Sequence, residues 1–495
     1  MASEPKTPAP PIELAEAELA KSSFEHHESN VEEDEADAAM MRRITWKIDL
    51  RLLPLCVFIY CLCFLDRVNI GNAKLWHLER DLNMHGLQFN IVTLVFYIPY
   101  ILFEIPANMI ISRIKPRYWI SGLTFGFGLT VTLCGLCTNF GGFLTARLFI
   151  GVFESGMFPG FLLLIGSWYT RRQVGARLAW FLVANDIAGS VSGLLGAGLG
   201  SLDGTNGYSG WSWIFFIEGA MTCFAAIIAF FFLLPFPKES TFLTPEEKEF
   251  WLRKLAIENA HYEEDKMKLN GVWKALLDWK LIATAFMYLA VCTSAYSITV
   301  FQPSILSTFG WSSMKANLLT SPVRIASGIV SVSVATLSNR LNRRGIFVAI
   351  GFCVAILGLL FTMLHHDYRV RYMGLYFGAI GIYIAQPLVI AWGVAQVAGR
   401  TKRGTLTAAA SSLGQVGGII SALIFPNSDK PYYVPGGSVC VGFAAAGCVV
   451  CLTMWFFLSM ENKMRKAGKR DHLRSLPQEE QYKLGEKHPN FRYTM

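Results

Sequence analysis

The chain has 495 residues, of which 53% are hydrophobic and only 16% are charged. A soluble protein of this size would need far more surface charge, so the composition excludes that class and predicts an all-α protein embedded in a lipid bilayer. The formal net charge of +8 comes from basic residues spread between apolar runs, which argues against a nucleic-acid-binding protein.

Residues 1–44 are rich in Pro, Glu and Ala and predict a disordered cytosolic tail. The basic residues that end this segment and follow it, Arg42, Arg43, Lys47 and Arg51, predict the cytoplasmic edge of a first membrane span.

The cysteines lie in apolar runs, where Cys acts as a small hydrophobic residue. The Cys134-x-x-Cys137 spacing has no second pair nearby, so we expect no metal site and no cofactor.

Twelve apolar segments are long enough to cross a bilayer, and they form two groups of six. We expect a first bundle over residues 45–236, a cytoplasmic linker over 237–278, a second bundle over 279–462 and a cytosolic tail over 463–495. The expected spans are 50–71, 88–111, 118–137, 143–168, 174–200 and 211–234, then 280–305, 316–338, 345–365, 371–394, 404–425 and 438–460.

The Lys and Arg residues in the short loops predict the orientation. Loops after even-numbered spans hold twelve of them, against six in loops after odd-numbered spans. Because cytoplasmic loops carry the excess of Lys and Arg, both termini are predicted to face the cytosol.

The linker contains one predicted helix. Thr244 and Pro245 supply an N-cap and a first-turn proline, and Phe250, Trp251 and Leu255 give an apolar stripe. We expect this amphipathic helix to lie on the inner membrane face and to join the two halves.

The two halves repeat a basic loop. Arg113 and Arg117 follow the second span, and Arg340 follows the eighth, so we assign these three residues a gating or structural role. A duplicated unit of this kind is typical of secondary transporters, which bind substrate near the membrane midplane between the halves.

Four charged residues inside the expected spans form the main candidate site. Asp66 and Arg67 lie near the far end of the first span, while Arg147 and Glu154 lie seven residues apart on the fourth. Seven residues are two helical turns and about 10 Å, so both side chains share one face and come level with the first-span pair. Two carboxylates and two guanidiniums are therefore expected to meet in one cavity.

This grouping suggests proton-coupled binding of an anion. Arg67 or Arg147 would bind a carboxylate through a bidentate fork, and in the absence of substrate Glu154 or Asp66 would occupy that fork. Protonation of the acid would then release the arginine for substrate. The alternative is a purely structural charge cluster that locks the two halves together.

Other polar residues in the spans are weaker candidates. Glu104 is expected to pair with a basic residue of the inner gate, and Asp186 is assigned a gating or structural role. Arg324 stands out because an unpaired cation in a membrane needs an anion. For each candidate an interhelical hydrogen bond is the alternative. The expected substrate contacts are Tyr97, Asn185, Gln302, Arg324, Gln386 and Gln415.

Several motifs carry a resemblance to a known family. They are residues 66–73 (DRVNIGNA), 103–108 (FEIPAN), 147–156 (RLFIGVFESG) and 392–396 (WGVAQ). In this pattern the chain resembles the major facilitator superfamily, specifically its anion:cation symporter branch and the fungal allantoate, nicotinate and vitamin permeases. The resemblance covers about residues 45–465 and implies the twelve-helix, two-bundle fold of that superfamily.

The resemblance also implies proton-coupling roles for Asp66 and Glu154 and an anion-binding role for Arg67. The chain departs from the pattern at Gln396 and Gln415, where fungal relatives have Asn, and Arg324 is not part of it.

The expected function is import of a small organic anion, such as a monocarboxylate vitamin or a ureide, together with protons across a fungal plasma membrane. The chain has no P-loop motif for ATP, so the energy must come from an ion gradient. The alternatives are a uniporter or exporter of an uncharged solute and a non-transporting nutrient sensor. We expect a monomer and not an enzyme, since no nucleophile or metal-ligand spacing accompanies Asp66 and Glu154.

Overall fold

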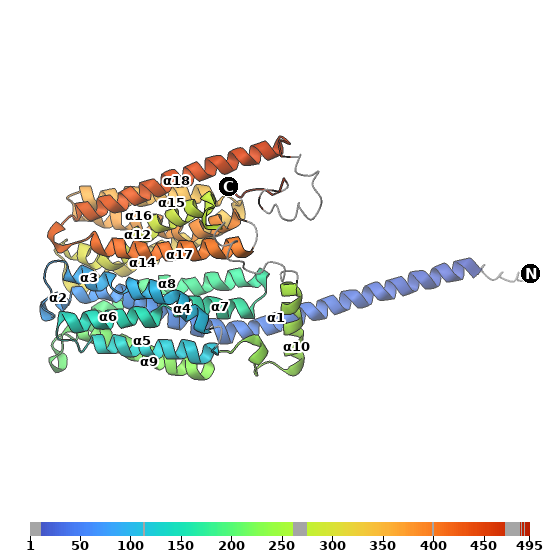
Figure 1. Ribbon diagram of the computed structural model, residues 1–495, viewed down its shortest axis with the longest axis horizontal. Coiled ribbons are helices and arrows are strands. Elements are labelled where there is room, and N and C mark those ends of the chain that lie inside the picture. The colour runs from blue at the N-terminus through green and yellow to red at the C-terminus, as the bar shows by residue number, and fades with distance from the viewer. Residues whose placement is uncertain are drawn as a thin grey trace, which may run out of the picture.

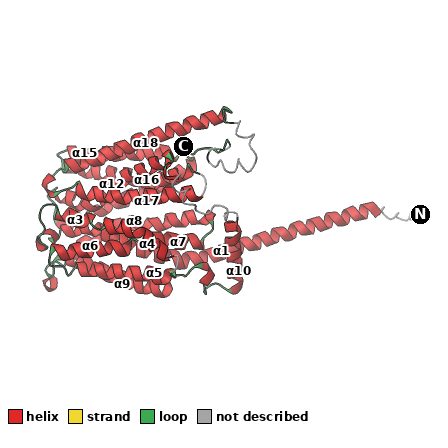
Figure 2. Ribbon diagram, in the orientation of Figure 1, coloured by secondary structure: helices red, strands yellow, loops and turns green. Residues whose placement is uncertain are grey.

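The computed structural model describes residues 11–495 except 112–113, 261–274, 398–399, 471–485, 487 and 490. Within these residues all regular structure is helical, as Figure 2 shows. The helices run roughly side by side in two stacks, and Figure 1 shows the first half of the chain below the second. Ten helices are long and apolar enough to cross a membrane, so the fold is the predicted all-α membrane protein in two bundles.

The first bundle contains nine α-helices, and short helices flank several of its long ones. They are α1 (Pro11–Lys74), α2 (Leu78–Asp81), α3 (Gln88–Leu94), α4 (Tyr97–Ile111), α5 (Pro116–Cys134), α6 (Phe140–Glu154), α7 (Met157–Trp168), α8 (Arg171–Gly200) and α9 (Gly210–Phe232).

The second bundle follows the linker helix α10 (Pro245–Ala260). Its helices are α12 (Trp279–Ser307), α13 (Ser313–Leu318), α14 (Thr320–Leu341), α15 (Arg344–Leu364), α16 (Tyr368–Ala395), α17 (Arg400–Leu423) and α18 (Val434–Lys466).

Two expected spans are broken near their middles. The second consists of α3 and α4, and the fourth of α6 and α7. Pro99 and Pro159 cause the breaks, because a proline ring clashes with the carbonyl four residues earlier and removes a helical hydrogen bond. Those carbonyls belong to Val95 and Ser155, which lie in the breaks.

Helix α1 begins at Pro11, inside the segment 1–44 for which the composition predicts disorder. The structure differs from that prediction, because the segment is also rich in Ala and Glu, which favour helix. Figure 1 shows this part of α1 extending away from the bundles.

The predicted linker helix is present as α10. Thr244 Oγ1 accepts a hydrogen bond from the Glu247 amide at 3.3 Å, and Glu247 Oε2 accepts one from the Thr244 amide at 3.2 Å, which is a capping box. Trp251 is buried, and its indole donates to the Trp168 carbonyl at 3.0 Å. The helix therefore packs against the end of the first bundle, and Figure 1 shows it lying across the long helices.

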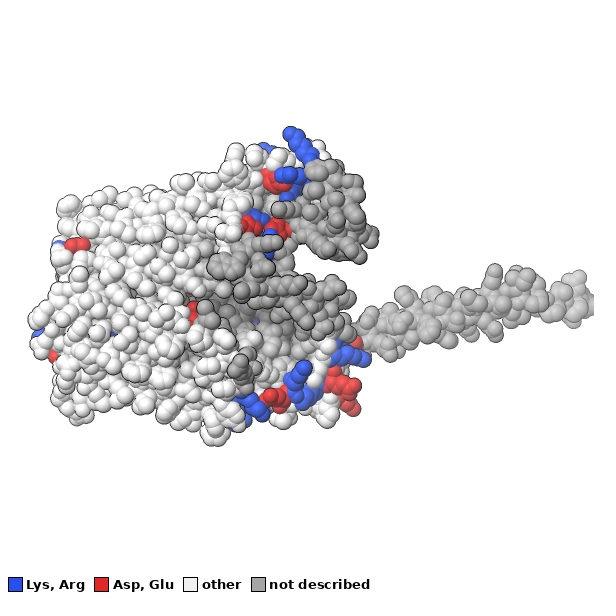
Figure 3. Space-filling model, in the orientation of Figure 1, with Lys and Arg blue, Asp and Glu red and all other residues white. Residues whose placement is uncertain are grey.

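Charged side chains concentrate at the ends of the molecule, and most of the surface between them is uncharged on the face that Figure 3 shows. Large apolar side chains such as Phe224, Ile329 and Val449 are more than 60% exposed on the long helices. This distribution suits a body whose middle lies in a bilayer and whose ends meet water.

The two bundles meet along several helix pairs of the described residues, including α8 with α13 and α17 with α4. Helix α8 packs against α14, α1 against α12, and α17 against α3. At Gly193 of α8 an added Cβ would overlap Thr320 and Ser321 of α14. Only a residue without a side chain allows the halves to approach this closely.

We therefore predict that Gly193→Ala destabilises this closed arrangement by about 1–3 kcal/mol, the usual cost of overpacking. Thermal unfolding of the purified protein in detergent measures the effect. Gly198→Ala on the same helix is the matched control, because its added Cβ meets nothing within 4 Å. Equal melting temperatures for the two variants would contradict the tight contact at Gly193.

Candidate functional site

Asp66 and Arg147 form a fully buried ion pair between α1 and α6. Arg147 Nη1 donates to Asp66 Oδ2 at 2.7 Å, and both side chains are at most 2% exposed. The neighbouring residue on α1, Arg67, pairs with Glu154, the last residue of α6. The structure thus brings the four predicted charges together, as two crossed pairs between the same two helices.

The helix breaks shape this site. Glu154 ends α6 at the break caused by Pro159, and Phe96 lies in the break between α3 and α4. At Gly151 an added Cβ would overlap the Phe96 carbonyl, so the two interrupted spans touch there. This contact places the aromatic residues of α4 beside the charges of α6.

Aromatic rings lie beside the guanidinium groups of both arginines. The Arg67 guanidinium carbon lies 5.0 Å from the ring centroid of Phe96 and 4.9 Å from that of Tyr100, and Arg147 lies 5.7 Å from Phe96. Cation–π contacts of this kind stabilise a guanidinium away from water without neutralising it. Each arginine therefore remains available to an anion if its carboxylate partner leaves.

Neither ion pair satisfies all of its polar atoms. Asp66 Oδ1, Arg67 Nε, Arg147 Nε and Glu154 Oε2 are buried and have no hydrogen-bond partner among the described residues. A buried pair must recover the cost of leaving water through complete hydrogen bonding, and these two pairs do not. The two ion pairs therefore add little to the stability of the fold. Their arginines are suited to exchanging one carboxylate partner for another.

Tyr97 does not contact the charges but links the two bundles. Its ring packs edge-to-face on Tyr296 of α12, with centroids 5.4 Å apart, and the Tyr296 hydroxyl donates to Gln415 Oε1 at 3.1 Å. Two predicted contact residues, Tyr97 and Gln415, are therefore joined through Tyr296, which the sequence did not single out.

Glu218 of α9 is a third buried carboxylate that the sequence reasoning missed. It is 1% exposed, accepts a hydrogen bond from Asn69 at 2.9 Å, and makes no ion pair with any described residue. Asn72 donates to Asn69 at 2.8 Å and to the Ser192 carbonyl of α8 at 3.0 Å. The available signal was a lone acid in an apolar span, the criterion that identified Glu154.

Arg324 forms a separate cluster in the second bundle. It is 4% exposed, donates to the hydroxyls of Tyr383 and Thr299, and lies 4.8 Å from the Tyr383 ring centroid. No carboxylate of the described residues is within ion-pairing distance. Arg324 therefore makes no direct ion pair with a described residue, although Asp186 of α8 lies near enough to interact with it electrostatically.

A narrow crevice between the bundles lies beside Arg324 and has no room for even a water-sized molecule. Its walls include Val68 and Asn72 of α1, Ser192 of α8, and Gln302 of α12. Sites for small molecules usually occupy about 300–1,000 Å³, so the two halves have closed on this space.

The remaining candidates lie outside both clusters or at their margins. Asn185 and Asp186 are half-buried on α8, and Asp186 approaches Gly328, one turn after Arg324. Gln386 is half-buried on α16, one turn from Tyr383.

Of the gate residues, Arg117 donates to the Phe230 carbonyl, Arg340 is exposed, and Arg113 lies outside the described residues. No described basic residue forms an ion pair with Glu104, and Arg113 of the expected inner gate lies outside the described residues, so the predicted pairing stays a prediction. The Glu104 side chain is half-exposed on α4.

Comparisons with known proteins agree with this architecture. The family model of the Major Facilitator Superfamily matches residues 56–422. The MFS-type transporter cnsO of Penicillium expansum is 31% identical over 92% of this chain and 91% of its own length. The high-affinity nicotinic acid transporter of Saccharomyces cerevisiae is 28% identical over 92% of this chain and 85% of its own length.

A solved structure shows a similar fold. The chain is similar to a bacterial homolog of the human lysosomal transporter Spinster in an inward-facing, unoccupied conformation, with a TM-score of 0.64 and 17% identity. The similarity covers 82% of this chain and 94% of that one.

The buried pair of Asp66 and Arg147 makes a prediction about stability. Asp66→Asn should destabilise the protein by about 3–5 kcal/mol, because it leaves the Arg147 charge buried and unpaired. Adding Arg147→Met should recover part of that loss, since it removes the orphaned charge. Thermal unfolding of the single and double variants measures the coupling, and strictly additive losses would contradict the ion pair.

Proposed function

The chain belongs to the Major Facilitator Superfamily, and we propose that it is a proton-coupled symporter that imports a small organic anion. It is a membrane transporter and not an enzyme. The proposal rests on one observation: the only carboxylate that pairs with Arg67 among the described residues is Glu154.

The exchange of partners on Arg67 would couple proton and anion. While Glu154 is ionised it neutralises the Arg67 guanidinium, and a carboxylate substrate must compete with it for that charge. A proton on Glu154 removes its charge and releases Arg67, which then binds the substrate carboxylate through its fork. Proton and anion are therefore bound together or not at all.

The second bundle supplies the other half of the proposed site. Arg324 faces the crevice whose opposite wall includes Val68, the residue after Arg67. An anion between the halves would meet cations from both sides and favour their closure. Asp66 and Arg147 would hold the first-bundle side of this arrangement in place, and Glu218 offers a second position for a proton.

A monocarboxylate is the substrate class we propose. One of the relatives is named as a transporter of nicotinic acid, an aromatic monocarboxylate. The aromatic residues Tyr97 and Tyr296, stacked across the bundle interface, give a ring-shaped substrate a surface to pack against. Nicotinate is accordingly the first compound to test, followed by ureide acids.

We also propose a fungal plasma-membrane location with both termini in the cytosol. The excess of Lys and Arg after the even-numbered spans supports this orientation. The linker helix and the C-terminus lie at the end of the bundles from which the N-terminal part of α1 extends, as Figure 1 shows.

The role of Glu154 predicts a separation of two activities. In proteoliposomes, Glu154→Gln should abolish accumulation of labelled nicotinate driven by a pH gradient and retain exchange of nicotinate across the membrane, because Gln carries no charge to compete for Arg67. Glu104→Gln is the matched control, since Glu104 pairs with no described cation and should keep both activities. Loss of both activities in Glu154→Gln alone would indicate a structural role.

The two proposed anion ligands predict a loss of affinity. Arg67→Lys and Arg324→Lys keep the charge but remove the planar fork, so each should weaken nicotinate binding about 10- to 100-fold, as expected for lost hydrogen bonds to a charged group. Competition uptake measures the affinity, and Arg369→Lys at the exposed start of α16 is the control. Unchanged affinity in both variants would refute the proposed anion site.

A further inference from the structure

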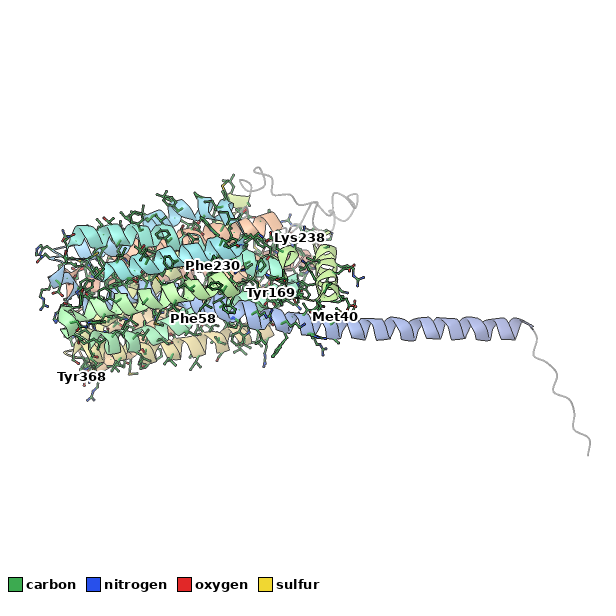
Figure 4. The ribbon with its side chains drawn as sticks, turned by 90° about the horizontal axis from the view of Figure 1, so that it is seen from below. Met40, Phe58, Tyr169, Phe230, Lys238 and Tyr368 are labelled. Carbon is green, nitrogen blue, oxygen red and sulfur yellow. The ribbon has the colours of Figure 1, made fainter. Side chains whose placement is uncertain are left out.

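A lipid-facing groove on the first bundle has the features of a binding site. It has a volume of about 620 Å³ and lies between the ends of α1 and α9, with Thr241 and Phe242 of the linker at one edge. This volume falls in the range typical of small-molecule sites. The groove lies at the end that we propose faces the cytosol, and Figure 4 shows this side, with Phe58 and Phe230 labelled.

The walls of the groove are mainly apolar and open to the membrane. Leu50 of α1 is 55% exposed, and Phe231 and Phe232 at the end of α9 are 62% and 70% exposed. Exposure of these apolar side chains to acyl chains has no free-energy cost. In water the same side chains would form an unfavourable apolar patch.

Two arginines give the groove its charge. Arg117 donates through Nε to the Phe230 carbonyl, which leaves its terminal nitrogens available, and Arg51 lies 4.9 Å from the Phe242 ring centroid. Neither pairs with a carboxylate of the described residues, and no lining residue is acidic. The groove therefore carries two positive charges without a protein counter-ion.

The neighbouring basic residues of α1 do pair with a carboxylate, so the lack of an ion pair among the described residues is specific to the arginines of the groove. Arg43, Lys47 and Arg51 recur every four residues on one face of α1, and the first two pair with Glu247 of α10 at 3.5 and 2.6 Å. Arg51 is one turn further along α1, forms no ion pair with a described residue, and lies against the Phe242 ring.

We propose that this groove binds a phospholipid with an acidic head group. The phosphate would lie between Arg51 and Arg117, matched by their donor forks, and an acyl chain would follow the apolar walls. Two cations that form no ion pair with a described carboxylate favour a lipid of net negative charge over a zwitterionic one, as in other basic pockets at the cytoplasmic membrane surface. The linker edge at Phe242 would then sense whether the lipid is bound.

Native mass spectrometry of the full-length protein, with equal amounts of phosphatidylinositol and phosphatidylcholine, tests the proposal. The wild type should retain phosphatidylinositol preferentially, and Arg51→Gln with Arg117→Gln should reduce that retention about tenfold or more. Lys47→Gln is the matched control, because it removes one positive charge from the same helix outside the groove. Equal losses in Lys47→Gln and the double variant would show diffuse attraction to charge and overturn the site.

A second variant tests the acyl-chain position without changing charge. Leu55→Trp should fill the groove and lower phosphatidylinositol retention, while binding of soluble inositol phosphate should remain weak in every variant. Unchanged lipid retention in Leu55→Trp would also overturn the proposal. The readout needs no transport, so its result is independent of the proposed symport.

Discussion

Burial of four charges between α1 and α6 is the constraint around which this protein is arranged. Asp66, Arg67, Arg147 and Glu154 are at most 5% exposed, in the part of the chain where water is scarcest. Isolated charges there would cost many kcal/mol, so each must find a partner. The two crossed ion pairs give each charge a partner. One polar atom on each of the four residues still has no hydrogen bond among the described residues. The same arrangement that permits folding therefore leaves polar atoms free for the proton and the anion of the proposed symport.

The backbone around the charges follows from two prolines. Pro99 and Pro159 interrupt the second and fourth spans at neighbouring places, and the contact between Gly151 and Phe96 joins the interruptions. Phe96 and Tyr100 are thereby placed over Arg67, and Glu154 is placed at the end of α6. Broken helices at the depth of the substrate site are a recurring feature of secondary transporters, because irregular backbone is tolerated where it lines a polar cavity.

The sequence predicts much of this arrangement and misses parts that depend on tertiary contacts. Hydropathy is sufficient to place the spans, and the two-turn spacing of Arg147 and Glu154 is sufficient to place them level with Asp66 and Arg67. The choice of partners was left open, because adjacent residues on α1 point about 100° apart and only the packing angle decides which one meets Glu154. The pairing expected for Glu104 stays a prediction, because depth along a helix does not reveal which side chains the residue faces and Arg113 lies outside the described residues. The role of Tyr296 depends on contacts between distant spans, which no local pattern encodes, whereas Glu218 could have been found as a lone acid in an apolar span.

The central claim is that one proton accompanies the anion because Glu154 and substrate compete for Arg67. Its most direct test is the proton movement that nicotinate itself drives in proteoliposomes without an imposed pH gradient, followed with a pH-sensitive dye in the lumen. An inward nicotinate gradient should acidify the lumen in the wild type and should fail to do so in Glu154→Gln, even where labelled nicotinate still crosses. Nicotinate uptake by the wild type without any lumenal acidification would contradict the account.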